Sequence, residues 1–251
     1  MIYMSRGLET LYEIAKKAGH GLVRDFHELE QLQNAPRGHI EFTKAAIDRT
    51  LSILKTELGK FRPDCAVLTS AEKLPETECF IIHPMDGKDN FMHGIDCFAI
   101  NISLVKNKDV LATIIYNPAT GDAFFAEKGK GAFKNGARNH VRLRVSSHKD
   151  ANMVIIASND KDFICNTKFN WRNSGALSMD LAKIAEGKTD SLVTTNYSVE
   201  ELIAGAFLVK EAGGVVYNSL QKKKDNDDIF SEKGKIIIGN PNIARKLIDL
   251  V

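Results

Sequence analysis

The chain has 251 residues, which is enough for one large domain or two lobes that share a core. Its formal charge of +2 gives no electrostatic drive toward nucleic acid or a membrane surface, and 43% hydrophobic residues is ordinary for a globular protein. The apolar runs are far shorter than a membrane span and the first residues lack a signal-peptide stretch, so we expect a cytoplasmic protein with no membrane contact.

The first half of the chain begins with two predicted helices. Apolar residues recur at helical spacing over 5–26 and 40–60, and the polar stretch 27–38 between them is typical of a loop. Short apolar or alternating runs then predict strands over 65–69, 79–83, 98–105, 110–117, 123–127 and 141–145. Residues 128–140 are rich in Gly and Asn and are expected to form tight turns.

The second half alternates strands with helices. Strands are predicted over 153–157, 190–194, 215–217 and 236–238, and helices over 174–186, 198–212 and 241–250, with Ser174 as an N-cap and a charged loop over about 218–234. This order predicts a layered sandwich of mixed α+β and α/β class. We expect an N-terminal α+β lobe over 1–146 and a C-terminal α/β lobe over 147–251 in one compact unit.

The four cysteines are too far apart in sequence to form a metal-ligand pair. Cys79 and Cys97 fall in apolar, strand-like runs, where a free thiol packs as a small core residue. We therefore expect free thiols and a reducing compartment.

The most informative stretch is Phe80–Phe91, where a buried strand leads through Pro84 into Asp86-Gly87 and a short helical turn. Asp86 would present a carboxylate at a pocket mouth, and the backbone N–H groups after it would face an anion. A carboxylate for a hard cation beside N–H groups for phosphate is what metal-assisted hydrolysis of a phosphate ester requires. The alternative is an ordinary capped turn, since Asp-Gly and Asp-Asn are common in turns.

This stretch resembles the first signature of the inositol monophosphatase family, an apolar strand followed by Asp-Pro-Ile/Leu-Asp-Gly-Thr-Thr-Asn-Phe. The family's second signature, Trp-Asp before a helix that ends Glu-Ala-Gly-Gly, is similar to residues 200–214. The family's intervening and later turns are matched in order by Tyr116-Asn-Pro118, Gly129-Lys-Gly131, Asn135-Gly136, Arg172–Gly187 and Gly239-Asn-Pro241. The resemblance covers nearly the whole chain and implies the family's αβαβα fold.

The resemblance also implies hydrolysis of phosphate monoesters with bound magnesium. In the family's pattern Asp86 is the second aspartate of the first signature, a metal ligand and catalytic residue, and the backbone carbonyl of Met85 is a further ligand. Gly87 and Lys88 are the expected phosphate-binding residues, and Lys88 stands where the family has a threonine that positions water and phosphate.

Three other family positions are replaced. His83 stands at the first aspartate, Ser70 at the upstream catalytic glutamate, and Glu201 at the aspartate of the second signature. Since Mg²⁺ prefers six oxygen ligands, a histidine and a neutral serine remove roughly two negative charges from the site. The resemblance therefore predicts magnesium in a depleted site, with manganese, zinc or no metal as alternatives.

The replaced residues leave more than one interpretation open. His83 is either a neutral, hydrogen-bonded residue at a strand end or a ligand for a nitrogen-tolerant ion such as zinc or manganese. Glu201 either reaches a cation or is an acid favoured in the first turn of a helix. The Lys88 ammonium either occupies the emptied metal site, paired with Asp86 and Glu201, or lies exposed at a turn.

The substrate side of the resemblance is altered too. Gly175, Ala176, Leu177 and Thr194 correspond to the family's sugar-contacting region, and Leu177 would intrude into a polyol pocket. An acidic residue expected near Thr194 is absent, and residues 158–169 are shorter than the family's segment, which would remove a helix beside the pocket.

Three functions follow from these observations. The first is a phosphatase of small phosphorylated polyols, of inositol-1-monophosphatase type, with activity weakened or lost through the replaced ligands. The second is a non-catalytic interaction protein like the family's extragenic suppressor members, which act with the transcription machinery on ribosomal RNA genes, although no basic stripe here favours direct RNA binding. The third is a sensor of a phosphorylated metabolite at the Gly87 turn. The resemblance also implies a homodimer.

Overall fold

A computed structural model describes residues 4–32, 36–136, 139–150, 153–220, 229–230 and 234–250. The helices are α1 (Arg6–Leu32), α2 (Pro36–Phe61), α3 (Lys88–Met92), α4 (Lys161–Asn166), α5 (Leu177–Ala185), α6 (Val199–Glu211) and α7 (Pro241–Ile248). The strands are β1 (Ala66–Leu68), β2 (Cys79–Asp86), β3 (Ala99–Lys106), β4 (Asp109–Tyr116), β5 (Ala123–Glu127), β6 (Gly131–Lys134), β7 (Val141–Arg142), β8 (Ile155–Ser158), β9 (Asn170–Arg172), β10 (Ser191–Thr194), β11 (Val215–Asn218) and β12 (Ile236–Gly239).

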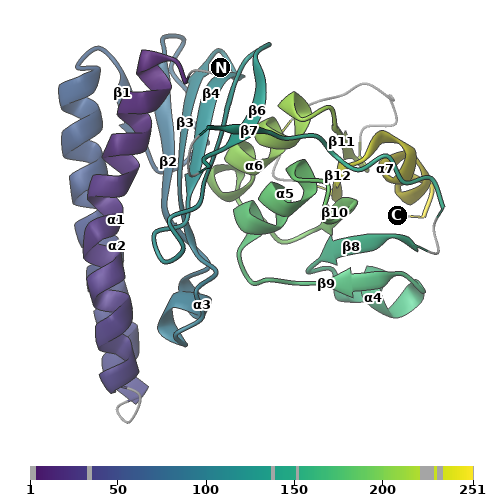
Figure 1. The fold of residues 1–251 in the computed structure, drawn as a ribbon, viewed down its shortest axis with the longest axis horizontal. Coiled ribbons are helices and arrows are strands. Elements are labelled where there is room, and N and C mark those ends of the chain that lie inside the picture. Colours follow the sequence, from purple (N-terminus) through teal and green to yellow (C-terminus); the bar gives the residue numbers. More distant parts are fainter. Residues whose placement is uncertain are drawn as a thin grey trace.

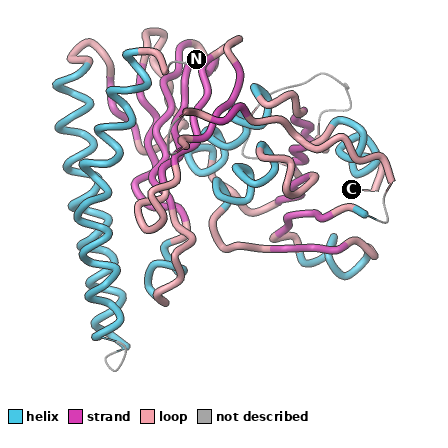
Figure 2. The backbone as a smooth tube through the Cα atoms, viewed as in Figure 1, coloured by secondary structure: helices cyan, strands magenta, loops and turns pink. Residues whose placement is uncertain are grey.

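Helices and sheets alternate in five layers (Figure 1). Within the described ranges the strands form a seven-stranded sheet in the order β1-β2-β3-β4-β5-β6-β7 and a five-stranded sheet in the order β11-β12-β10-β8-β9. The paired helices α1 and α2 cover the outer face of the larger sheet, α5 and α6 lie between the two sheets, and α7 packs on the smaller sheet (Figure 2). The predicted αβαβα sandwich is confirmed.

Strand β2 illustrates how the larger sheet is apolar on both faces. Cys79 and Ile81 belong to the hydrophobic cluster shared with α5 and α6, whereas Phe80 and Ile82 belong to the cluster under α1 and α2. Successive side chains of a strand point to opposite faces, and a sheet covered by helices on both faces needs apolar residues at both sets of positions. The motif strand is therefore buried between two helical layers.

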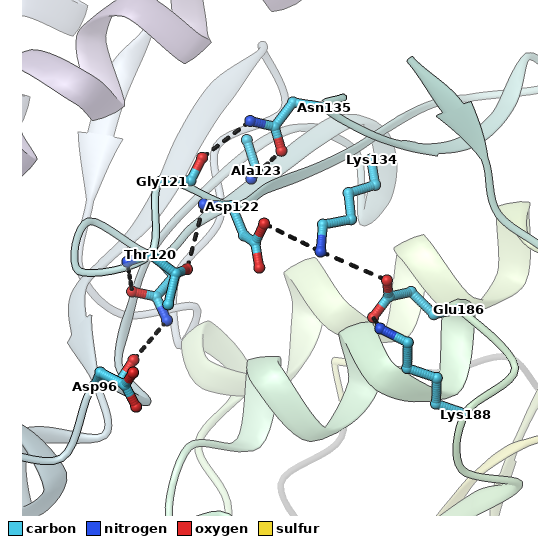
Figure 3. Close-up of polar contacts among 10 residues, drawn as sticks. Asp96, Thr120, Gly121, Asp122, Ala123, Lys134, Asn135, Glu186 and Lys188 are labelled. Atoms are coloured by element: carbon cyan, nitrogen blue, oxygen red, sulfur yellow. Dashed lines mark hydrogen bonds and ion pairs between the residues drawn. The ribbon is translucent and has the colours of Figure 1, made fainter. Parts of the chain in front are cut away.

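Polar contacts also join the layers. Lys134 on β6 lies between Asp122 (3.0 Å) and Glu186 (3.6 Å), and so connects the larger sheet to the end of α5 (Figure 3). Glu211, the glutamate of the Glu-Ala-Gly-Gly sequence at the end of α6, accepts hydrogen bonds from the backbone N–H groups of Gly129 (3.0 Å) and Gly131 (2.9 Å). The second family signature therefore holds the turn between β5 and β6.

Several predicted boundaries were wrong. The loop predicted over 27–38 is mostly helix, because α1 continues to Leu32 and α2 begins at Pro36, a favourable residue for a first helical turn. The continuation keeps Leu29 buried, next to Phe26, which packs against Phe98 at a centroid distance of 5.2 Å. The prediction of turns over 128–140 missed β6, whose Ala132 and Phe133 are buried.

Residues 158–169 contain a short helix that was not predicted, α4, whose N-cap Asp160 accepts a hydrogen bond from the backbone N–H of Phe163 (3.1 Å). No residue of α4 lines the cleft described below, and the expected loss of a helix beside the pocket stays a prediction. The strand β9 that follows was not predicted. The central part of the predicted charged loop, residues 221–228 and 231–233, lies outside the described residues.

The four cysteines are free, as predicted. Cys79 is buried, as expected, whereas Cys97 is only half-buried. None of the described helices combines the length and the apolar character that a bilayer-spanning helix needs.

Candidate active site

A cleft of about 510 Å³ opens where the end of β2 approaches the start of α5. Most of the predicted site residues line it: His83, Met85, Asp86, Gly87, Lys88, Gly175, Ala176, Leu177 and Glu201. Ile47 of α2 and the amide side chains of Asn159, Asn173 and Asn196 complete much of the wall. Segments more than 80 residues apart in sequence therefore meet at one hollow.

A bulge in β2 turns His83 and Asp86 toward the same side. His83 pairs with Asn101 and Asp86 pairs with Ala99, so two residues on β2, Pro84 and Met85, lie opposite a single residue on β3. In a regular strand residues three apart would point to opposite faces, and the extra residue of a bulge corrects this. The bulge is thus the local device that brings the two signature positions into the cleft.

The Asp86 carboxylate is buried and accepts three hydrogen bonds. One oxygen accepts from the backbone N–H of Leu177 (3.2 Å), and the other accepts from the backbone N–H (2.6 Å) and the hydroxyl (2.5 Å) of Ser178. Burial raises the pKa of Asp86, and the Ser178 hydroxyl and the His83 imidazole oppose that rise. Sequence reasoning did not single out Ser178, because only the fold shows that it faces Asp86.

The two carboxylate oxygens of Glu201 have different neighbours. One oxygen accepts a hydrogen bond from the backbone N–H of Ser198 (3.2 Å), as in a capping box at the start of α6. The other lies 3.8 Å from Nε2 of His83, within ion-pair range only when the imidazole is protonated. This geometry favours the helix-start interpretation of Glu201.

The motif turn itself is built on a glycine that no other residue replaces easily. Gly87 has φ 80°, and a Cβ there would lie 2.7 Å from the backbone oxygen of Cys97. The next residue, Lys88, is exposed, and among the described residues no ion pair joins its ammonium to Asp86 or Glu201. The arrangement favours the exposed-turn interpretation of Lys88.

Two predicted site residues lie apart from the cleft wall. Ser70 is exposed and accepts a hydrogen bond from the backbone N–H of Glu72 (3.3 Å), and the segment after it lines a separate hollow of about 700 Å³. That hollow is larger than the cleft but contains no residue of the first signature, so its size does not make it the better candidate site. Thr194 is buried and donates to the side chain of Asn159 (2.8 Å), a wall residue.

The start of α5 differs from its prediction. The helix begins at Leu177, with Ala176 rather than Ser174 at the N-cap. Gly175 adopts φ 79° in close contact with Asn90, and the Asn90 amide donates to the backbone oxygens of Cys97 (2.6 Å) and Ser174 (2.7 Å). The first signature's asparagine therefore fixes the loop before α5, which the sequence alone did not reveal.

The metal-binding side chains of the cleft do not form a ready cluster within the described residues. No group of three or more His, Cys, Asp or Glu side chains in the described ranges is arranged to hold a metal ion. The side chains at the family pattern's ligand positions inside the cleft are His83, Asp86 and Glu201, and the donors described above hydrogen-bond to oxygens of the two acids. Mg²⁺ needs a near-octahedral set of oxygen ligands.

The five layers and the interlayer cleft define a sugar-phosphatase fold. The model of the inositol monophosphatase family matches residues 4–251 of the chain. The chain belongs to the inositol monophosphatase family, which is magnesium-dependent.

Relatives of two kinds resemble the whole chain. The inositol-1-monophosphatase of Mesorhizobium japonicum is 30% identical over 97% of this chain and 95% of its own length. The putative Nus factor SuhB of Neisseria meningitidis is 27% identical over 99% of this chain and 98% of its own. A crystal structure of the extragenic suppressor protein SuhB from Bartonella henselae superimposes with a TM-score of 0.82 at 32% identity and covers 98% of both chains.

Proposed function

We propose that the cleft binds the phosphate end of a small phosphorylated polyol and hydrolyses it weakly or not at all. The observation that carries this proposal is which residues line the cleft. The signature positions of a phosphate monoesterase family converge there, yet Asp86 is the one family-type acid among His83, Asp86 and Glu201. Ser70 lies outside the cleft wall and is neutral.

The phosphate would lie at the Gly87 turn. The left-handed glycine sets the direction of the backbone there, and the exposed Lys88 ammonium adds a positive charge at the mouth of the cleft. Gly175, Ala176 and Leu177 would border the organic part of the ligand, with Leu177 and Ile47 as apolar side chains in the wall. This wall favours a smaller or less hydroxylated group than inositol.

Any cation would be held by a reduced ligand set. His83, Asp86, Glu201 and the Met85 carbonyl are the groups at the positions that the family pattern assigns to metal binding, and Asp89 and Asp180 also line the cleft. A bound ion would neutralise phosphate and polarise water. The imidazole favours manganese or zinc over magnesium, because nitrogen ligands suit those ions better. The absence of a ready-made three-residue ligand group in the described ranges supports weak binding of any of them.

The test is phosphate release from inositol monophosphate in Mg²⁺, Mn²⁺ or Zn²⁺. We expect the unmodified protein to be at least ~100-fold slower than an intact relative, since loss of outer-shell partners alone costs roughly 10–100-fold. The double variant His83→Asp, Ser70→Glu should recover part of the rate in Mg²⁺. Its matched control, His93→Asp with Ser52→Glu, adds the same groups away from the cleft and should recover none. Activity of the unmodified protein equal to the intact relative's rejects the proposal.

A second candidate function is that of an interaction protein of the extragenic suppressor type. It is favoured by the similarity to relatives named as Nus factors and by the Bartonella henselae structure. The partner would be the transcription machinery, and the chain would act as a homodimer. Addition of the purified protein to transcription through a ribosomal RNA leader tests it: a change in terminator read-through supports this role, and no change at saturating protein rejects it. Light scattering tests the dimer.

A further inference from the structure

Helix α5 begins without a cap of its own. Its N-cap residue is Ala176, whose methyl group cannot accept a hydrogen bond. The first N–H groups of a helix have no partner within the helix and need acceptors from elsewhere, especially when they are buried. Ser178, in the first turn, has no exposed surface, so its N–H needs an acceptor within the protein.

The acceptor comes from the other side of the cleft. Asp86 lies 91 and 92 residues before Leu177 and Ser178, and its two oxygens accept their backbone N–H groups at 3.2 and 2.6 Å. The Ser178 hydroxyl adds a third bond of 2.5 Å to the oxygen that already receives the Ser178 N–H. A carboxylate of the larger sheet therefore caps a helix of the middle layer.

We propose that Ser178 is a positioning residue that holds Asp86 as an interlayer helix cap, in the place where a cation would otherwise face this carboxylate. The inference rests on the proposed function only in that both concern the same cleft. Each carboxylate oxygen has about two favourable acceptor directions. The Ser178 N–H and O–H fill both directions at one oxygen, so a metal ion must displace the hydroxyl or share the remaining oxygen.

Thermal unfolding with and without metal ions tests whether a cation can take the place of the Ser178 hydroxyl at the Asp86 carboxylate. Tm is measured for the full chain in EDTA and in 10 mM MgCl₂ or 1 mM MnCl₂. We expect the unmodified protein to shift by less than about 1 °C, because the carboxylate is already occupied. Ser178→Ala should lower Tm in EDTA by about 3–6 °C through loss of one buried, charge-assisted hydrogen bond. Added metal should then raise the Tm of this variant by about 3 °C or more.

Ser103→Ala is the matched control. Ser103 is equally buried, and its hydroxyl lies 3.0 Å from that of Thr113, away from the cleft wall. This variant should lose stability without gaining a response to metal. The proposal is overturned if Ser178→Ala responds to metal no more than Ser103→Ala does, or if the unmodified protein already shows the larger shift.

A second pair of variants tests the cap without any metal and without Ser178→Ala. Asp86→Asn keeps an acceptor for Ser178, whereas Asp86→Ala removes it, and asparagine is among the good N-cap residues. In EDTA we expect the fall in Tm caused by Asp86→Asn to be at most about half of the fall caused by Asp86→Ala. Equal losses overturn the cap. Neither measurement uses substrate, so a failure of the proposed hydrolysis in the phosphate assay remains a separate result.

Discussion

The two ends of α6 carry acids of the same family signature but differ in what those acids do. At its C-terminal end Glu211 stands in the family's Glu-Ala-Gly-Gly sequence and binds the Gly129 and Gly131 N–H groups. At its N-terminal end Glu200-Glu201 replaces Trp-Asp, and Glu201 caps its own helix. At these two ends of α6, the contact that joins the layers follows the family pattern, whereas the position that the resemblance assigns to metal binding does not. We therefore expect the fold and the chemistry of the cleft to be separable.

The strongest test of this separation is a structural contact inside the first signature. Asn90→Ala removes two short hydrogen bonds and leaves the backbone oxygens of Cys97 and Ser174 without their donor. We expect a loss of about 3 kcal/mol in the free energy of unfolding, since each buried unsatisfied group costs about 1–3 kcal/mol. Urea denaturation measures it, with the exposed, locally bonded Asn166→Ala as control. A loss below about 1 kcal/mol would show that this signature residue is not structural.

The contact at the far end of α6 should cost less because it is partly exposed. Glu211→Ala removes one carboxylate that serves two backbone donors, and we expect a loss of about 2 kcal/mol, or a fall in Tm of about 4–8 °C. The exposed Glu76→Ala should stay within about 0.5 kcal/mol of the unmodified protein. If the two variants are indistinguishable by calorimetry, the structural half of the comparison fails.

The N-terminal end of α6 should show a smaller effect of a different kind. Glu201→Ala should cost about 1 kcal/mol through loss of the capping box, whereas Glu201→Gln keeps an acceptor and should cost only a few tenths. Thermal unfolding of both variants, in EDTA and again in MgCl₂, distinguishes them. A cation-binding role predicts instead that Gln and Ala lose any Mg²⁺-dependent stability equally.

The pH dependence of folding stability provides the test with the smallest expected effect. Asp180 on α5 is largely buried, and this burial raises its pKa despite hydrogen bonds from Ser174. The folded state therefore binds a proton more tightly than the unfolded state, so the contribution of Asp180 is present below its ordinary value of 3.8 and is lost as pH rises through the raised pKa. The stability of the unmodified protein relative to Asp180→Asn should fall over that interval in urea titrations. A rise would contradict the assigned burial.

Much of the fold was predictable because its signals are local. The apolar stripes of α1 and α2, the buried run of β2 and the strand–helix alternation of the second half all follow from residue periodicity. The missed elements, β6, α4 and β9, are short and depend on tertiary partners, as when β6 pairs with β5. The spacing of apolar residues does not reveal the bulge in β2, and only Pro84 marks its place in the sequence.

The site was less predictable, because its decisive contacts join residues far apart in sequence. The Asp86-Gly87 turn was visible in the sequence, and the cleft does gather most of the predicted residues. The roles assigned to them, from metal binding to phosphate binding, stay predictions. Ser178 had no sequence signal, since a serine in a first helical turn is ordinary until Asp86 is found beside it.

The most direct measurement is a crystal structure of the unmodified protein grown with excess Mn²⁺ and examined by anomalous scattering. We expect the Ser178 hydroxyl to lie within hydrogen-bond distance of Asp86, with no manganese pair at that carboxylate. Two strong anomalous peaks coordinated by Asp86, with the Ser178 hydroxyl displaced, would contradict the account.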